Sequence, residues 1–351
     1  MEQETTFNRM NMNSRTRYMT VLSGRTADHV PRIPILMQFA AEYIGSNYGA
    51  FASDYRVLVK ANEACARDFG MDQVSCISDP YRETHGFGGE ITYVTDGVPR
   101  CAHPLSDDKD LKKLAVPDPM KSERMLDRVN ACRLFRERLG GEYSILGWVE
   151  GPAAEAADLR DVGNLLMDLL DDEVYACELM DLALETAIRF ARAQIEAGAD
   201  TIGVGDAIAS QVSRDVYERL ILPREDALVK AIKQMGAFAR LHICGDITHL
   251  LNGIAALDID ILDVDHMVDL AKVRKAVGGR MVIAGNIDPV GGVLRGNPES
   301  IRSAIMEAYR RAGAPYMVNA GCEIPAGTPE ENLRALCAPI PMTGIGRLTC
   351  A

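Results

Sequence analysis

The sequence predicts an α/β fold: a TIM (β/α)8 barrel with a polar N-terminal arm and a β-hairpin excursion after the second strand. Short segments rich in Val and Ile alternate with helical patterns, which is typical of repeated βα units around a parallel sheet. There are eight such segments, the number that a TIM barrel requires. An open nucleotide-binding sheet would need a glycine-rich turn after its first strand, but the chain there reads QFAAEYIG.

Each expected strand ends at a polar residue or a glycine. The strands are expected at 33–37, 73–77, 144–149, 201–204, 239–243, 259–264, 281–284 and 316–319. Between them, Ala, Leu, Glu and Met recur at helical spacing over 155–199, and amphipathic helices are expected near 106–139 and 299–313. Pro223 lies inside the helical pattern at 214–236 and should divide it into two pieces.

The longest connection follows the second strand. Within it, GFGGEITYVTDGVPRCAHPL predicts a β-hairpin, with turn chemistry at Thr95, Asp96 and Gly97. This hairpin could serve a homodimer or a partner protein. Because no repeat or linker separates two halves, residues 24–351 are expected to form one catalytic domain after a polar arm at 1–23.

Composition narrows the class of protein. The chain has 351 residues and a formal net charge of −12, with no basic stripe, which argues against nucleic acid as a partner. Its apolar runs are far shorter than the roughly 20 residues of a membrane span, and its first residues lack the apolar core of a signal peptide. The nine cysteines lack the spacing of a disulfide framework. These features predict a cytoplasmic protein with free thiols.

Polar residues follow most of the expected strands. They are Asp79, Glu150, Asp206, His242, Cys244, Asp265, Asn286, Asp288 and Cys322. Because barrel enzymes build their sites at the carboxyl ends of the strands, these side chains are expected to gather at one mouth.

The sequence LHICG at 241–245 carries the most specific chemistry. Residues two apart in a strand point the same way, so His242 and Cys244 should project together. With Cys322 from another strand end they make an N/S₂ ligand set for zinc that leaves a position open, as catalytic zinc sites do. Asp265 could approach as a fourth, displaceable ligand, or could instead cap the helix that begins near Val268.

Two thiolate ligands soften the Lewis acidity of zinc, and this favours holding and activating a thiolate nucleophile. Glu150, Asp206 and Asp79 are the predicted catalytic residues, and Glu150 and Asp206 could orient a substrate or manage protons. A loop hydrogen bond or a helix cap explains a single carboxylate at a strand end equally well.

Nearly the whole chain also resembles a known family. The matching stretches are MNSRTRYMTVLSGR near the start, DHVPRIP at 28–34, GP at 151–152, GDA at 205–207, LHICGD at 241–246, GNIDP at 285–289 and NAGCEIPAGTPEENL at 319–333. They resemble the uroporphyrinogen decarboxylase superfamily and, within it, the zinc-dependent corrinoid methyltransferases.

The resemblance implies a function. His242, Cys244 and Cys322 would hold Zn²⁺, and a methyl group would move between a small substrate and the cobalt of a corrinoid (methylcobalamin) carried by a separate corrinoid protein. Asn286 and Asp288 are the predicted cofactor-binding residues. The substrate would be a thiol bound as zinc thiolate or a methoxylated donor acted on by zinc as a Lewis acid; the two-thiolate ligand set leans toward the thiol.

Two alternatives stay open. In the decarboxylases of this superfamily an aspartate on the second strand holds the substrate, and Asp79 could match it. The paired arginines that such enzymes carry after the first strand are, however, missing from QFAAEYIG. The decarboxylases also need no cofactor and have no use for His242 and Cys244 as a pair. The other alternative is a barrel that binds zinc or a tetrapyrrole without catalysis, in which a structural zinc would need a fourth protein ligand.

Overall fold

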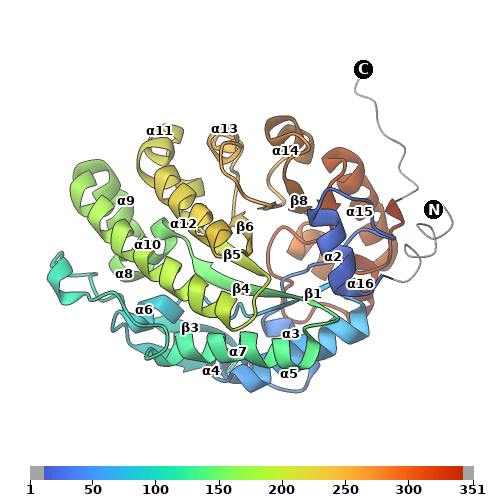
Figure 1. Ribbon diagram of the computed structural model, residues 1–351, viewed down its shortest axis with the longest axis horizontal. Helices are drawn as coiled ribbons and strands as arrows, with labels where there is room; N and C mark the ends of the chain where they lie inside the picture. The colour runs from blue at the N-terminus through green and yellow to red at the C-terminus, as the bar shows by residue number, and fades with distance from the viewer. Residues whose placement is uncertain (1–11, 343–351) are drawn as a thin grey trace.

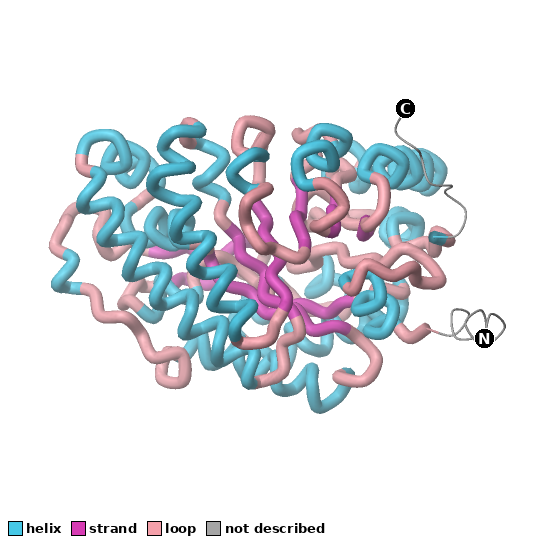
Figure 2. The backbone as a smooth tube through the Cα atoms, turned by 45° about the horizontal axis from the view of Figure 1, so that its top comes forward, coloured by secondary structure: helices cyan, strands magenta, loops and turns pink. Residues whose placement is uncertain are grey.

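The computed structural model describes residues 12–342, and its centre is a curled parallel sheet of seven strands. Figures 1 and 2 show this sheet with helices along its outer side. The strands, in their order across the sheet, are β1 (Gln73–Ser75), β4 (Ser144–Glu150), β5 (Thr201–Gly205), β6 (Phe238–Ile243), β7 (Ile261–Val264), β8 (Val282–Gly285) and β9 (Tyr316–Met317). All six neighbouring pairs are parallel, which confirms the α/β class and seven of the expected strands.

The segment expected to be the first strand, 33–37, is extended but is not a regular strand. It lies between the two ends of the sheet: Ile33 N–H donates to the carbonyl of Val318 at 2.9 Å, while Asp72 N–H donates to the carbonyl of Arg32 at 2.8 Å. Pro31 and Pro34 flank this contact and have no N–H to donate, so a continuous hydrogen-bonded ladder cannot form. A closed barrel of eight strands therefore stays a prediction.

Helices connect the strands. In the described residues they are α2 (Ser14–Leu22), α3 (Gln38–Tyr43), α4 (Tyr48–Ser53), α5 (Tyr55–Phe69), α6 (Arg82–Gly86), α7 (Glu123–Leu139), α8 (Pro152–Arg160), α9 (Val162–Asp171), α10 (Glu173–Glu196), α11 (Arg214–Val216), α12 (Leu222–Gln234), α13 (Leu251–Ile254), α14 (Leu270–Val277), α15 (Pro298–Ala312) and α16 (Glu330–Leu336). Within 12–342 none of these helices combines the length and apolar character needed to cross a bilayer.

Two of the expected helices differ in extent. The pattern at 155–199 is three helices rather than one, because α8 ends where Asp161 adopts a positive φ of 78° and caps α9, and Asp172 then caps α10. The helix expected near 106–139 begins only at Glu123. Pro117 and Pro119 interrupt the preceding stretch. At Pro223 the helical backbone is not broken: the π-helical segment Tyr217–Ile221 passes directly into α12, so the irregularity expected there takes the form of a π-helical segment rather than two separate helices.

The predicted hairpin is present as β2 (Ile91–Val94) and β3 (Gly97–Cys101), which pair antiparallel and contact α4. The prediction of an arm at 1–23 needs correction where the chain is described, since α2 is packed against the sheet. Tyr18 and Val21 are buried, and the hydroxyl groups of Tyr18 and Thr201 lie 2.8 Å apart. Residues 1–11 lie outside the described part.

Candidate metal centre

The three predicted zinc ligands meet at the carboxyl ends of β6 and β9. The candidate ligand atoms of His242, Cys244 and Cys322 all lie within 4.8 Å of one another. His242 Nε2 is 3.0 Å from Cys244 Sγ, and the two sulfur atoms are 3.7 Å apart. One imidazole nitrogen and two thiols at these separations fit a single zinc ion and leave a coordination position for a substrate.

Local sequence places each ligand. His242 is on β6, and Cys244 directly follows this strand, two residues after His242 and therefore on the same side. Gly321 brings Cys322 close: a Cβ at this position would lie 2.3 Å from the backbone nitrogen of His266, so only glycine permits the approach of the two loops.

Asp263 stands behind His242 and was not predicted. In the register of the sheet it lies beside His242 on β7, and its Oδ2 is 3.4 Å from His242 Nδ1. Arg240 Nη2 donates to the same oxygen at 2.6 Å, and Asn319 Nδ2 donates to Oδ1 at 2.8 Å. The carboxylate is thereby fixed on the side of the imidazole away from Cys244, where it can orient a metal-binding histidine.

The contacts within the cluster favour the thiolate form of Cys322 and the neutral thiol form of Cys244. Burial lowers the pKa of His242, but the neighbouring Cys244 and Asp263 outweigh it and raise that pKa well above its usual value. The hydrogen bond from Cys244 lowers the pKa of Cys322 to about 4, and the same bond raises the pKa of Cys244. Thiolate is the form in which cysteine binds zinc.

A small cavity of about 180 Å³ opens above the cluster. His242, Cys244 and Cys322 form part of its lining. The apolar part of the wall comes from Ile35, Met37, Ile77, Pro80 and Trp148, and the carboxyl groups in the lining belong to Asp79, Glu150 and Glu323.

Two of the three predicted catalytic carboxylates, Asp79 and Glu150, line this cavity. Arg124 donates to both oxygens of Asp79, at 2.8 and 2.7 Å. Although burial opposes ionisation, Arg124 lowers the pKa of Asp79 below its usual value. Glu150 Oε1 accepts from Arg82 at 2.7 Å and from Trp148 Nε1 at 3.2 Å, while burial raises the pKa of Glu150 to about 8.

The third, Asp206, is not part of the cavity wall. It is fully buried beneath the start of α8 and accepts the Ala154 N–H at 2.8 Å. Burial raises its pKa to about 7. The structure therefore favours the helix-cap alternative for Asp206.

Asp265, Asn286 and Asp288 also lie outside the cavity wall. Asp265 accepts the N–H groups of Gly245 and Met267, both at 3.0 Å, and is not in the cluster of ligand atoms. Asn286 donates to the carbonyls of Asp265 and Val268 at 2.9 and 2.7 Å. Asp288 caps the π-helical segment Pro289–Leu294. These side chains hold the loops around the centre, and the structure does not bring them into it.

Sequence reasoning missed two further residues of the cavity. Trp148 is the single tryptophan of the chain and precedes Glu150 by two residues, so strand periodicity would have placed both on one side. Glu323 directly follows Cys322, and this adjacency was the available signal. Its Oε1 accepts the Gln38 N–H at 3.1 Å.

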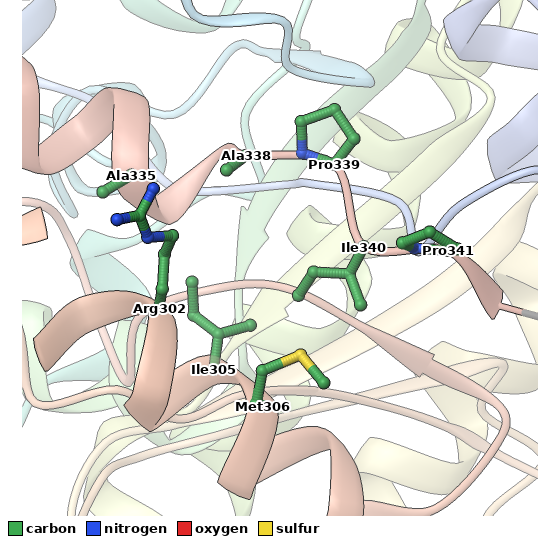
Figure 3. A pocket seen from close by; sticks show the side chains of 8 residues that line it. All are labelled: Arg302, Ile305, Met306, Ala335, Ala338, Pro339, Ile340 and Pro341. Carbon is green, nitrogen blue, oxygen red and sulfur yellow. The ribbon is translucent and has the colours of Figure 1, made fainter. Parts of the chain in front are cut away.

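A second cavity, of about 270 Å³, lies between α15 and residues 338–341. Figure 3 shows that it is lined mainly by apolar side chains, with Arg302 at one side. It contains no cysteine, histidine or carboxylate, so it offers none of the chemistry of the cluster.

Comparisons with known proteins show which family the chain belongs to. Residues 13–340 match the family model described as uroporphyrinogen decarboxylase (URO-D). A methylcobamide:CoM methyltransferase, MtaA of Methanosarcina barkeri, is 27% identical over 92% of this chain and 96% of its own. A uroporphyrinogen decarboxylase of Crocosphaera subtropica is 30% identical over 76% of this chain and 77% of its own. A solved methyltransferase from Methanosarcina mazei superposes with a TM-score of 0.86 at 26% identity, covering 93% of this chain and 98% of that one. The chain belongs to the uroporphyrinogen decarboxylase family, and it resembles methyltransferases of that family over nearly its whole length.

Proposed function

We propose that this protein is a zinc-dependent methyltransferase that moves a methyl group between a corrinoid and a small thiol. The single observation that carries the proposal is the meeting of His242, Cys244 and Cys322 on the lining of one cavity. The match to methylcobamide:CoM methyltransferases supports the corrinoid as the other partner. A zinc ion bound there would hold the thiol of the substrate as a thiolate, the form that accepts a methyl group.

The residues of the chain would bind and orient the reactants. Asp263 would orient the ring of His242, and Cys322, whose pKa is lowered to about 4, would supply negative sulfur. Ile77 and Trp148 form apolar parts of the wall, which would shield the sulfur of a bound substrate from water. A cavity of about 180 Å³ is far too small for a corrinoid ring, so the corrinoid would meet the substrate at the mouth, carried by a separate protein.

The same geometry does not favour decarboxylation of a porphyrinogen. Both oxygens of Asp79 are occupied by Arg124, and Ser78 Oγ donates to Oδ2 at 2.7 Å, which leaves this carboxylate poorly placed to take pyrrole N–H groups. A tetrapyrrole would also exceed the volume of the cavity.

The proposal is tested by measuring both the zinc content and the methyl-transfer activity of the purified protein. Zinc in the purified protein is measured by mass spectrometry, and transfer from free methylcobalamin to small thiols is followed by the change in its absorbance and by detection of the methyl thioether. We expect about one zinc per chain and thiol-dependent demethylation. Methoxylated aromatic compounds with reduced cobalamin form the second arm, because they represent the other substrate class.

His242→Ala and Cys244→Ala should lose zinc and transfer together, since each removes a ligand. Cys177→Ala is the matched control, because Cys177 is a free, half-buried cysteine on α10 outside the cluster. Retention of both zinc and transfer by Cys244→Ala would overturn the proposal.

A further inference from the structure

The single tryptophan of the chain lies across one strand of the sheet. Trp148 and Glu150 on β4 pair in register with Gly203 and Gly205 on β5. A Cβ at Gly203 would lie 2.2 Å from Trp148 Cε3, and a Cβ at Gly205 would lie 2.9 Å from Trp148 Cζ2. Both distances are shorter than real contacts between such atoms, so a larger residue at either position would displace the indole from β5.

The indole reaches across β5 to the candidate metal ligands. Gly205 also pairs in register with His242 on β6, so β5 separates the strand of Trp148 from the strand of His242. Neighbouring strands are roughly 4.8 Å apart. The ring centroids of Trp148 and His242, on strands two apart, are nevertheless only 6.4 Å from each other. Because Trp148, Gly205 and His242 all line the cavity, the indole forms the part of its wall that stands beside His242.

Hydrogen bonds hold Trp148 in this place. The fully buried Gln194 of α10 accepts the Trp148 N–H at 2.9 Å through Oε1 and donates to the Trp148 carbonyl at 2.8 Å through Nε2. Trp148 Nε1 donates to Glu150 Oε1 at 3.2 Å. The backbone and the ring nitrogen are thus both engaged, and the residue is only 3% exposed. In a close-packed interior such a side chain cannot turn aside to admit a wider ligand.

Resting on the proposed function, we infer that Trp148 is a specificity-determining residue that limits the width of the substrate next to its sulfur. The indole wall stands beside His242, so a thiol bound at the cluster meets it with the carbon that carries the sulfur. An unbranched thiol fits beside this wall, whereas a thiol branched at that carbon collides with it. Differences of one carbon in an apolar pocket are discriminated by about 10–200-fold.

Two isomeric thiols test this inference. The n-butyl and tert-butyl thiols have the same composition and differ in branching at the carbon that carries the sulfur. Methyl transfer from free methylcobalamin gives kcat/KM for each thiol, and the zinc content of each variant is measured alongside. We expect the wild type to prefer the n-butyl thiol by at least about tenfold.

Two variants assign this preference to the indole. In Trp148→Phe the preference should fall several-fold, because the smaller ring leaves space over Gly203 and Gly205. Phe69→Leu is the matched control, since it removes a buried aromatic ring on α5 outside the cavity lining, and it should keep the wild-type preference. The two thiols differ in the pKa of their own sulfur, but that difference is the same for every variant.

Fluorescence gives a readout that does not depend on catalysis. Trp148 is the single tryptophan, so emission excited selectively from tryptophan reports on this side chain alone. Addition of the n-butyl thiol to the zinc-loaded wild type should change the intensity or the wavelength of the emission. Cys244→Ala, which lacks one of the proposed zinc ligands, should show no such change.

The outcomes separate this inference from the proposed function. Three results would overturn the inference and leave zinc-dependent methyl transfer standing. They are equal use of both isomers by the wild type, an unchanged preference in zinc-loaded Trp148→Phe, and emission that does not respond to a thiol that the protein methylates. Failure of both isomers and of mercaptoethanol to accept a methyl group would overturn the proposed function and this inference with it.

Discussion

At the scale of single residues, the candidate metal centre has a buried carboxylate behind its histidine. Asp263 is fully buried, and it faces His242 on one side and Arg240 on the other. Since a carboxylate behind a ligating imidazole fixes its orientation and raises its basicity, this pair should tune the metal affinity of the whole site.

Replacement of Asp263 by Asn should weaken zinc binding by about 10–100-fold, because the amide keeps the shape but loses the charge. Competition with a chromogenic chelator measures the affinity. Asn319→Ala is the comparison variant: it removes one hydrogen bond to Asp263 and leaves the charge, so its loss should be clearly smaller. Equal zinc affinities of wild type and Asp263→Asn would show that Asp263 forms the ion pair with Arg240 but does not contribute to zinc binding.

Glu150 should make the stability of the metal-free protein depend on pH. Burial raises its pKa from 4.5 to about 8, so between these values the folded chain holds a proton that the unfolded chain has lost. The contribution is therefore fully present below about pH 4.5 and is lost as the pH rises through about 8.

We expect the free energy of unfolding of Glu150→Gln to depend less on pH between about 4.5 and 8, since glutamine does not titrate. Urea denaturation of chelator-treated protein at pH 5, 6.5 and 8 measures the free energy of unfolding, at roughly 1.4 kcal/mol for each unit of pKa difference. Wild type should lose stability relative to the variant toward pH 8. Parallel profiles would contradict the raised pKa.

Residues of the candidate site could be predicted from the sequence where their placement depends on a short stretch of the chain. His242 and Cys244 share a strand face through simple alternation, and Cys322 lies in a distinctive strand-end sequence. Asp263 was not predictable, because its place beside His242 depends on the register between β6 and β7. Asn286 and Asp288 have the right chain positions, but their side chains make hydrogen bonds to nearby backbone groups instead, and the direction of such side chains is set by tertiary contacts.

At the scale of elements, the strands were predicted well because buried parallel strands have a strong apolar signal. Helix ends were harder. The break between α8 and α9 falls at Asp161, which adopts a φ of 78° and whose side chain accepts the N–H groups of Gly163 and Asn164. Nothing in the helical periodicity of 155–199 marks this turn, since an aspartate inside a helix is common.

The cap at Asp161 makes a separate prediction. Asp161→Ala should lower the free energy of unfolding by about 0.5–2 kcal/mol, because it loses the cap and keeps the strained backbone that the wild type already has. Asp161→Gly should cost less than about 1 kcal/mol, since glycine tolerates this φ. Urea denaturation compares the two. A glycine variant as unstable as the alanine variant would mean that strain contributes little here.

At the scale of the whole molecule, residues 32–37 link the two edges of the curled sheet without forming a regular strand. This segment is called the seam. Segment 33–37 joins β9 through Val318, and Asp72 joins the seam to β1. Asp72 is fully buried and accepts Arg32 N–H at 2.8 Å and Arg32 Nε at 3.0 Å, and it is also ion-paired with Arg17 of α2. One carboxylate therefore ties α2, the seam and the edge of the sheet together.

This network predicts the largest loss of stability from one conservative change. Asp72→Asn leaves the buried guanidinium of Arg32 without its charged partner, and should lower the free energy of unfolding by about 3–5 kcal/mol. Asp226→Asn, which breaks a partly exposed ion pair with Lys230 on α12, should change it by no more than about 0.5 kcal/mol. Hydrogen exchange distinguishes a local from a global effect: faster exchange should appear first at the Ile33 and Asp72 amides and in α2, ahead of β6. If the amides of β6 lose protection to the same extent, residues 32–37 and the centre of the sheet unfold as one unit. Residues 32–37 then cannot open separately from the strand that carries His242.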